Sequence, residues 1–414
     1  MKNKTNKLQY LLVACLLLFT SSSSQISTNK SLIIIWCIVS SIYYLSTQVQ
    51  ASRYLIHVVI ILVGISFIYF LINRAVDKQT YLGYFVYIVG AFSTVKVAGK
   101  MLPKILVDLV YYAAFISLPL YIFQLIDPDK LFELNNLFGL STRGNSNSII
   151  FNFTFLHPTR NCGFMWEPGA FAGILIICIY INTIIIQNYS VYSYRNIVLL
   201  SAILTTFSTL GYITLMFPLL SIMIHHKKYK YILPFIFALP ILSNINFLLP
   251  KLFNESNNVN NELYKTKHAT EDSQVSVSRS ASIAIDFSSF SERPILGYGI
   301  DFRTTNAKQI FDEYDENVIR SSGIMNLLLR FGLIGLFIYV YLIFRSFRFY
   351  ATKSSAVIFS LLIVLVLFSN PIDNSPFLFS LFFWMPFNLK PHFFSRVVLT
   401  QTTESTQFEK LDVF

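Results

Sequence analysis

The chain has 414 residues, of which 54% are hydrophobic and 13% are charged, and its mean hydropathy is +0.57. Water-soluble domains carry about 25% charged residues, so this composition excludes an ordinary soluble globular protein. Forty Phe and 24 Tyr against 15 Gly and 14 Pro also exclude a disordered, collagen-like or low-complexity chain.

The formal net charge of +11 suggests a nucleic-acid partner until the positions of the charges are considered. The long polar stretch 250–320 holds eight Lys or Arg and eleven Asp or Glu residues, so it is net acidic. The excess of positive charge lies in short connections between apolar segments, where it determines orientation in a membrane. We therefore expect no nucleic-acid partner. The four cysteines show no CxxC and no metal-ligand spacing, which predicts neither a disulfide framework nor a metal site.

Apolar runs of roughly 20 residues recur along the chain, which predicts an all-α, polytopic bundle of transmembrane helices. The first 24 residues have the outline of a signal peptide. No cleavage site is evident and another apolar segment follows at once, so an uncleaved first span is expected. The expected spans are 9–27, 30–48, 54–73, 81–99, 107–126, 167–187, 231–249, 323–344, 355–370 and 372–388, with an ambiguous run at 194–224.

The run 194–224 is either one long helix or a hairpin of two short helices. The basic cluster 225–230 falls on the same side as Arg195 only if the chain leaves and returns within this run, turning near Ser208. The positive-inside rule then predicts about 12 crossings, with both termini cytoplasmic; 11 crossings is the alternative.

The predicted organisation follows from this map. It comprises N-terminal helices (1–126), an extracytoplasmic loop (127–166), central helices (167–249), a large extracytoplasmic loop (250–322), C-terminal helices (323–390) and a cytoplasmic tail (391–414). Within the large loop, residues 275–290 are Ser-rich with apolar residues at mixed spacing, which predicts a short helix lying on the membrane.

The segment 157–170 is a first candidate site. Pro168 suits the first turn of a helix, and Glu167 would cap that helix, where the dipole favours an anion. A well-made helix start explains these residues without further function. The alternative is that His157, Arg160 and Glu167 place an imidazole, a cation and a carboxylate together at a bilayer boundary.

The second candidate lies in the large loop, where Gly297 and Gly299 predict a tight turn or a close backbone approach. Arginines at positions 279, 293, 303 and 320 lie in a loop that is otherwise acidic. Solvated salt bridges explain any one of them. As a set with Arg160, they suggest a clamp for phosphate or pyrophosphate, because guanidinium groups match phosphate oxygens. Glu292 and Asp301 are ordinary partners for Arg293 and Arg303, which are the weaker candidates.

Two further features lie in apolar runs. Arg330 falls inside the span 323–344, where a charged residue is costly and tends to be functional, although snorkelling to the interface is equally possible. The hydroxyl-rich patch 204–211 fits ordinary helix packing better than site lining.

Four motifs in order resemble the O-antigen polymerase and ligase family. They are Arg160 followed by Gly163-Phe164 and Glu167-Pro168, the hydroxyl-rich patch 204–211, the loop Arg279 with Pro294 to Gly299, and Asn326 with Leu329 to Leu336. The resemblance covers roughly residues 150–345.

The resemblance implies a multi-pass enzyme of the bacterial cytoplasmic (inner) membrane. Such an enzyme acts at the outer face on undecaprenyl-pyrophosphate-linked oligosaccharides, with no cofactor, nucleotide sugar or metal. The family's loop arginines map onto Arg160 and Arg279. Ligases usually have a His beside the Asn of the late span, whereas Ile324 and Met325 precede Asn326 here, which favours a polymerase. The family often has an acidic residue where this chain has Arg330, so the role of that position stays open.

We therefore expect a surface-polysaccharide polymerase (O-antigen, capsule or exopolysaccharide), a glycosyltransferase with Glu167 or His157 as the catalytic base. Its pyrophosphate would be bound by Arg160, Arg279, Arg293, Arg303 and Arg330. Its partners would be the lipid-linked substrate, the bilayer and, further, flippase and chain-length regulator proteins. The alternatives are a ligase that transfers glycan to lipid A core or protein, and a lipid-linked oligosaccharide flippase or transporter. A transporter would show related halves and many charges within its spans, which this chain does not.

Overall fold

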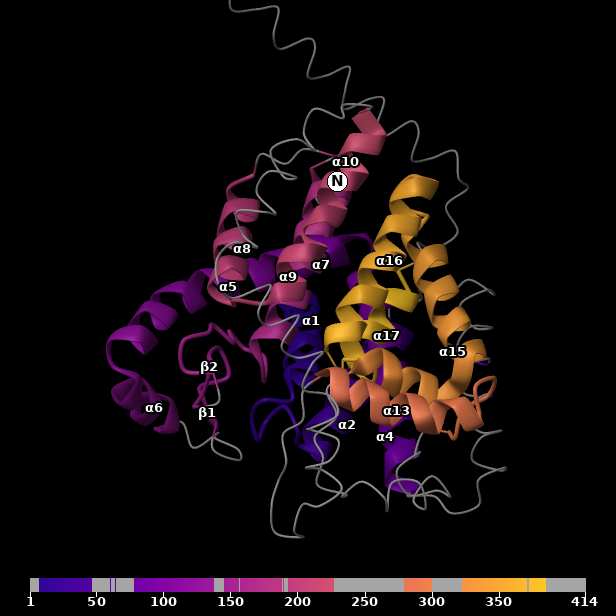
Figure 1. Ribbon diagram of the computed structural model, residues 1–414, viewed down its shortest axis with the longest axis horizontal. Coiled ribbons are helices and arrows are strands. Elements are labelled where there is room, and N and C mark those ends of the chain that lie inside the picture. Colours follow the sequence, from indigo (N-terminus) through magenta and orange to yellow (C-terminus); the bar gives the residue numbers. More distant parts are fainter. Residues whose placement is uncertain are drawn as a thin grey trace, which may run out of the picture.

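The computed structural model describes residues 7–46, 60, 64, 78–137, 145–155, 157–187, 189, 193–226, 279–299, 322–370 and 372–384. Most of them lie in helices, as the composition predicted (Figure 1). The helices before the centre of the chain are α1 (Lys7–Ser21), α2 (Lys30–Ser46), α4 (Lys78–Ala98), the 3-10 turn η1 (Gly99–Met101), α5 (Leu102–Ile126) and α6 (Pro128–Asn136). The later ones are α7 (Pro168–Ile181), the π-helical turn η2 (Asn182–Ile186), α8 (Tyr194–Thr205), α9 (Thr209–Thr214), α10 (Met216–His226), α13 (Arg279–Glu292), α15 (Gly323–Phe347), α16 (Lys353–Ser369) and α17 (Pro376–Phe382).

Short polar side chains begin several of these helices. Ser208, Ser322, Thr352 and Ser375 each accept a hydrogen bond from a backbone N–H in the first turn of the helix that follows. Such caps satisfy amide groups that have no partner within the helix. Within the described ranges, three helical stretches are long and apolar enough to cross a membrane: Tyr81–Ile126, Pro168–Ile186 and Gly323–Phe347.

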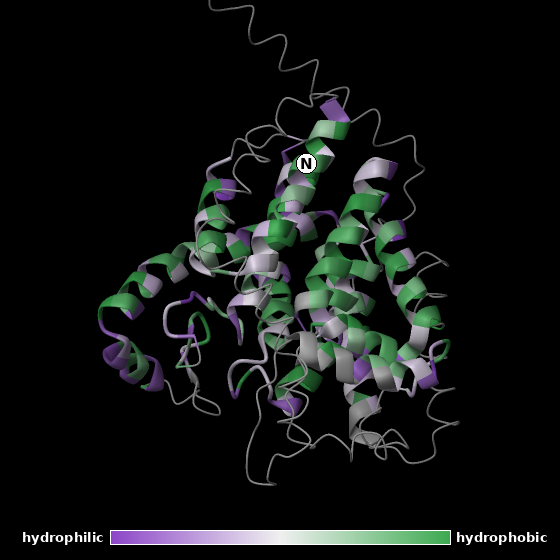
Figure 2. Cartoon of the chain, in the orientation of Figure 1, coloured by the Kyte–Doolittle hydropathy of each residue, from purple (hydrophilic) through white to green (hydrophobic). Residues whose placement is uncertain are grey.

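The helix α7 is the centre of the bundle. All fourteen of its residues are buried, and it packs against α5, α8, α9 and α16. A helix that is apolar on every side must be enclosed by other elements. Figure 2 shows hydrophobic residues along the lengths of the bundle helices and hydrophilic residues at many helix ends and on α6.

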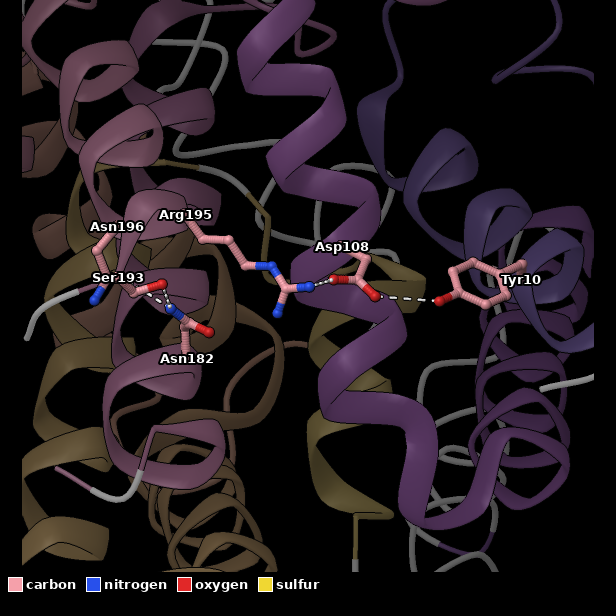
Figure 3. A network of polar contacts seen from close by, with 6 residues as sticks. All are labelled: Tyr10, Asp108, Asn182, Ser193, Arg195 and Asn196. Atoms are coloured by element: carbon pink, nitrogen blue, oxygen red, sulfur yellow. Dashed lines mark hydrogen bonds and ion pairs between the residues drawn. The ribbon is translucent and has the colours of Figure 1, made fainter. Parts of the chain in front are cut away.

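The bundle has two ends, which we name after residues on them. At the Arg195 end, the guanidinium of Arg195 pairs with Asp108 at 2.7 Å, and the Tyr10 hydroxyl donates to the same carboxylate at 3.1 Å (Figure 3). These contacts join the starts of α1, α5 and α8. The Glu167 end holds the start of α7, the end of α1 and the start of α15. The Ser23 hydroxyl of the chain just after α1 donates to the Phe164 carbonyl at 2.9 Å there.

The run 194–226 is a hairpin, as the charge pattern predicted. Helix α8 begins at the Arg195 end, where Asn182 donates to Asn196 at 2.8 Å. The chain turns at 206–208, and α10 returns to the same end, where His225 stacks on Tyr189 with 3.6 Å between ring centroids. Arg195 and the histidines that end α10 therefore lie at the same end of the bundle, and the cytoplasmic position of that end remains a prediction. The count of about 12 crossings remains a prediction, because the expected span 231–249 and nearly all of 54–73 lie outside the described residues.

Three further segments can be compared with their predictions. The short helix predicted at 275–290 is present as α13, which runs crosswise to the long helices and packs on α15 (Figure 1). The loop predicted at 127–166 contains more order than expected, namely α6 and an antiparallel pair of strands, β1 (Asn145–Asn147) and β2 (Asn152–Thr154). The expected span 372–388 was wrong at its start, because the chain is helical only from Pro376 to Phe382 within the described part and residues 372–375 form an irregular segment. Ser375, rather than the apolar run itself, sets where that helix begins.

Candidate functional site

Side chains of α5 hold the loop between β2 and α7 by donating hydrogen bonds to the loop's backbone carbonyls. Gln124 donates to the Pro158 carbonyl at 2.6 Å, and the Tyr121 hydroxyl donates to the Thr159 carbonyl at 3.0 Å. The backbone amide of Arg160 donates to the His157 carbonyl at 3.1 Å. The sequence from His157 to Arg160 therefore forms a compact turn on the end of α5, and both side chains are partly exposed.

Arg160 contacts the hydroxyl-rich turn between α8 and α9. Its Nε donates to the Thr206 carbonyl at 2.9 Å. The next residue, Asn161, is fully buried and donates from its side chain to Thr205 at 2.9 Å and to Ser117 at 3.1 Å. The patch for which we favoured packing therefore also forms the support on which Arg160 lies.

Glu167 occupies the N-cap position of α7, with an extended backbone (φ −146°, ψ 156°), and Pro168 follows at N1, as the sequence predicted. Its side chain makes no capping hydrogen bond to the helix, so the expectation of a carboxylate cap was wrong in that respect. An extended backbone is usual at an N-cap, so the missing hydrogen bond comes from the side-chain conformation of this half-buried residue.

Arg160 and Glu167 both act on the buried Cys162 thiol between them in sequence. Burial raises the pKa of this thiol to about 12, the Arg160 cation lowers it and the Glu167 carboxylate raises it. A thiol with this pKa stays protonated at neutral pH and is no nucleophile. That His157, Arg160 and Glu167 act together remains a prediction.

Arg330 forms an ion pair that the sequence did not predict. Its Nη1 lies 2.6 Å from Oδ2 of Asp373, and the two side chains are 17% and 3% exposed. Asn326, one turn earlier on α15, donates from Nδ2 to Oδ1 of the same carboxylate at 3.4 Å. Arg330 is therefore neither a free cation nor a side chain that snorkels into water. The sequence does not single out Asp373, because this residue falls at the start of an apolar run. The polar residues between Asn370 and Asn374, which separate two such runs, are the signal that could have indicated it.

A break in α15 places Arg330 at this position. Gly332 has φ 62° and ψ −164°, a non-helical conformation that interrupts an otherwise helical stretch. The loop after α13 fills the break: the amides of Tyr298 and Gly299 donate to the carbonyls of Leu329 and Arg330 at 2.7 and 2.8 Å. In return, the Pro294 carbonyl accepts from the Leu333 amide at 2.8 Å. The backbone groups exposed by the break are thus satisfied, which a position near a membrane requires.

This docking confirms the close backbone approach predicted at Gly297. A Cβ at Gly297 would lie 2.6 Å from the Leu329 carbonyl oxygen, and a Cβ at Gly332 would overlap the Ile295 carbonyl oxygen. Only glycine fits at either position, and both have positive φ. Two motifs that are separate in sequence are therefore one structural unit.

The structure describes the contacts of Arg293 but not those of Arg279 and Arg303. Arg293 lies over the Tyr298 ring with 5.0 Å to its centroid, and Tyr298 rather than Arg293 donates to Glu292, at 3.1 Å. Burial and this hydrogen bond raise the pKa of Tyr298 to about 12, so its hydroxyl remains a donor. Arg279 is the first residue of α13, and Arg303 lies outside the described residues. Arg160, Arg293 and Arg330 each contact a different partner, and the convergence of the arginines on one phosphate or pyrophosphate remains a prediction.

The Arg160 and Arg330 groups nevertheless belong to the same end of the bundle. Asn370, three residues before Asp373, donates to the Gly169 carbonyl in the first turn of α7 at 3.1 Å. The segment carrying Asp373 is thereby fixed beside the helix that Glu167 begins. In the described part of the chain, no group of three His, Cys, Asp or Glu side chains could hold a metal ion.

The comparison with protein families agrees with the motifs. Residues 195–340 match the model of a family described as O-antigen ligase, a range that includes the hydroxyl-rich turn, α13 and the break in α15. No curated protein matches the chain at a significant level. Members of this family are ligases and polymerases of the glycosyltransferase type, and the apolar helices agree with a membrane protein. Residues 195–340, about a third of the chain, are therefore similar to the O-antigen ligase family, in agreement with the resemblance seen in the motifs.

Proposed function

We propose that this protein is a surface-polysaccharide polymerase that joins lipid-linked oligosaccharide repeat units at the outer face of the cytoplasmic membrane. The residue before Asn326 favours a polymerase over a ligase. The ligase branch usually has His there, whereas Met325 is 4% exposed and packs with Phe290, Tyr298 and Leu329. An apolar cluster of this kind leaves no place for a titrating imidazole.

The proposed reaction transfers a glycan from its pyrophosphate to a sugar hydroxyl. The acceptor oxygen bonds to the anomeric carbon of the donor glycan, the bond from that carbon to the pyrophosphate oxygen breaks, and undecaprenyl pyrophosphate leaves. Negative charge develops on the leaving group, and fixed guanidinium groups stabilise it without proton transfer. Arg160 and Arg330 are the described candidates, because both are partly exposed and each is held by a hydrogen bond or an ion pair.

The acceptor hydroxyl must lose its proton. Glu167 is the better candidate base: it is half-buried, it lies at the same end as both arginines, and its carboxylate is not used to cap α7. His157 is the second candidate, three residues before Arg160 on the compact turn. Arg279 lies on α13, and its role in binding pyrophosphate is proposed from the family motif alone. Arg293 and Arg303 remain weaker candidates.

The surface glycans of a deletion strain test this proposal. Loss of a polymerase leaves single repeat units attached to the cell surface. Loss of a ligase leaves no attached glycan, and loss of a flippase traps lipid-linked units inside the cell. Either of the latter profiles would replace the polymerase by that alternative, and complementation with the wild-type gene is the control.

A further inference from the structure

Two buried amide oxygens flank the Arg330–Asp373 ion pair without a hydrogen-bond donor among the described residues. They are Oδ1 of Asn326, whose residue is 5% exposed, and Oδ1 of Asn374, which follows Asp373 directly. Buried acceptors in native proteins nearly always have a donor, so such exceptions require an explanation. A bound ligand that supplies the donors is one.

The orientation of the Asn326 amide is determined by its neighbour. Its Nδ2 donates to Asp373 Oδ1 at 3.4 Å, and the reversed amide would direct its oxygen at the carboxylate. The Asn326 oxygen must therefore face away from Asp373. It is a fixed acceptor beside an anion that is already neutralised by Arg330.

An unpartnered amide oxygen alone does not identify a site. Asn182 has one too, at the Arg195 end, where its Nδ2 donates to Asn196 (Figure 3). Asn326 differs because it contacts Asp373 of the ion pair, and Asn374 because it follows Asp373 directly, at the end of the bundle that carries Arg160 and Glu167. Their location therefore distinguishes them from Asn182.

The chemistry of the pair selects the ligand. The two amide oxygens offer only acceptors, so an anion gains nothing from them, and the neutralised Arg330–Asp373 pair beside them offers no net negative charge to a metal cation. A neutral group that donates hydrogen bonds fits, and sugar hydroxyls are such groups. We propose that Asn326 and Asn374 bind hydroxyls of the glycan and form a sugar subsite beside the pyrophosphate-binding arginine; this assignment rests on the proposed function.

Direct binding to the purified full-length protein in nanodiscs tests the subsite. One probe is the repeat-unit oligosaccharide released from its lipid by mild acid, and the other is undecaprenyl pyrophosphate without glycan. Asn326→Leu and Asn374→Leu should each weaken oligosaccharide binding roughly three- to tenfold, as expected for one neutral hydrogen bond. Asn374→Leu should leave undecaprenyl pyrophosphate binding unchanged. The control Asn182→Leu removes a fully buried asparagine, also with an unpartnered oxygen, from the other end and should leave both dissociation constants unchanged.

Unchanged oligosaccharide binding in both variants would overturn the proposal, because water alone would then satisfy the two oxygens. An equal loss in Asn182→Leu would also overturn it, since the effect would be general instability. If Asn326→Leu is not recovered in folded form, Asn374→Leu decides, because this residue is only partly buried. Polymerisation of lipid-linked units is measured separately: asparagine-dependent glycan binding without polymerisation would refute the polymerase and retain the subsite.

Discussion

Variants of the Arg330–Asp373 ion pair can distinguish a structural role of these two residues from a functional one. Its atoms lie 2.6 Å apart, and Asp373 is 3% exposed. Removing one partner of a buried pair leaves an uncompensated charge and costs about 3–5 kcal/mol, whereas replacing both partners by apolar residues is often nearly neutral. Arg330→Met and Asp373→Leu should therefore each destabilise the protein by about 3 kcal/mol or more, and the double variant should recover most of that loss.

Thermal unfolding of the purified variants in nanodiscs measures their stability. Polymer synthesis from lipid-linked repeat units measures their activity. All three variants should fail to polymerise, because the guanidinium that would stabilise the leaving pyrophosphate is missing or displaced. Wild-type unfolding in both single variants would show that the pair is solvated. Normal polymerisation by the double variant would show that Arg330 has only a structural role.

Four other outcomes are expected. A reporter fused at Asn257 should be active outside the cytoplasm and one at Lys228 inside; activity on the same side would refute the 12-span map. Arg160→Ala should abolish polymerisation at normal membrane abundance, and Arg160→Lys should restore it only in part, because an ammonium group cannot both reproduce the Nε contact with the Thr206 carbonyl and present a planar fork. Glu167→Gln should keep abundance near normal and strongly reduce long-chain product on glycan gels, whereas normal polymer would move the search for the base elsewhere. Gly332→Ala should release the loop after α13 from α15, since its Cβ would overlap the Ile295 carbonyl oxygen; limited proteolysis should then cleave that loop faster than in the wild type.

Features encoded in a local pattern could be predicted from the sequence. The hairpin in 194–226 follows from charge on both sides of an apolar run that is too long for one short helix and too short for two full spans. Pro168 predicted the start of α7, and two glycines around Tyr298 predicted a close backbone approach. In each case neighbouring residues determine the outcome.

Features that depend on distant partners could not be predicted. Arg330 and Asp373 are 43 positions apart, and nothing in either local sequence names the other. The hydroxyl-rich patch looked like packing because its contact with Arg160, 46 positions away, exists only in the folded chain. At Glu167, the N-cap position and the extended backbone before Pro168 were predictable, but the side-chain conformation that leaves the first-turn amides without a cap was not.

The break in α15 explains why the loop after α13 and the helix α15 pack together. A continuous helix would keep the carbonyls of Leu329 and Arg330 within its own ladder and leave the loop after α13 no edge on which to pair. Gly332 removes that continuity, and the backbone of residues 294–299 replaces the lost hydrogen bonds. The loop that carries Arg293 at its start is thereby tied to the helix residue that carries the Arg330 cation, and two arginine-bearing segments that the sequence separates are packed as one unit.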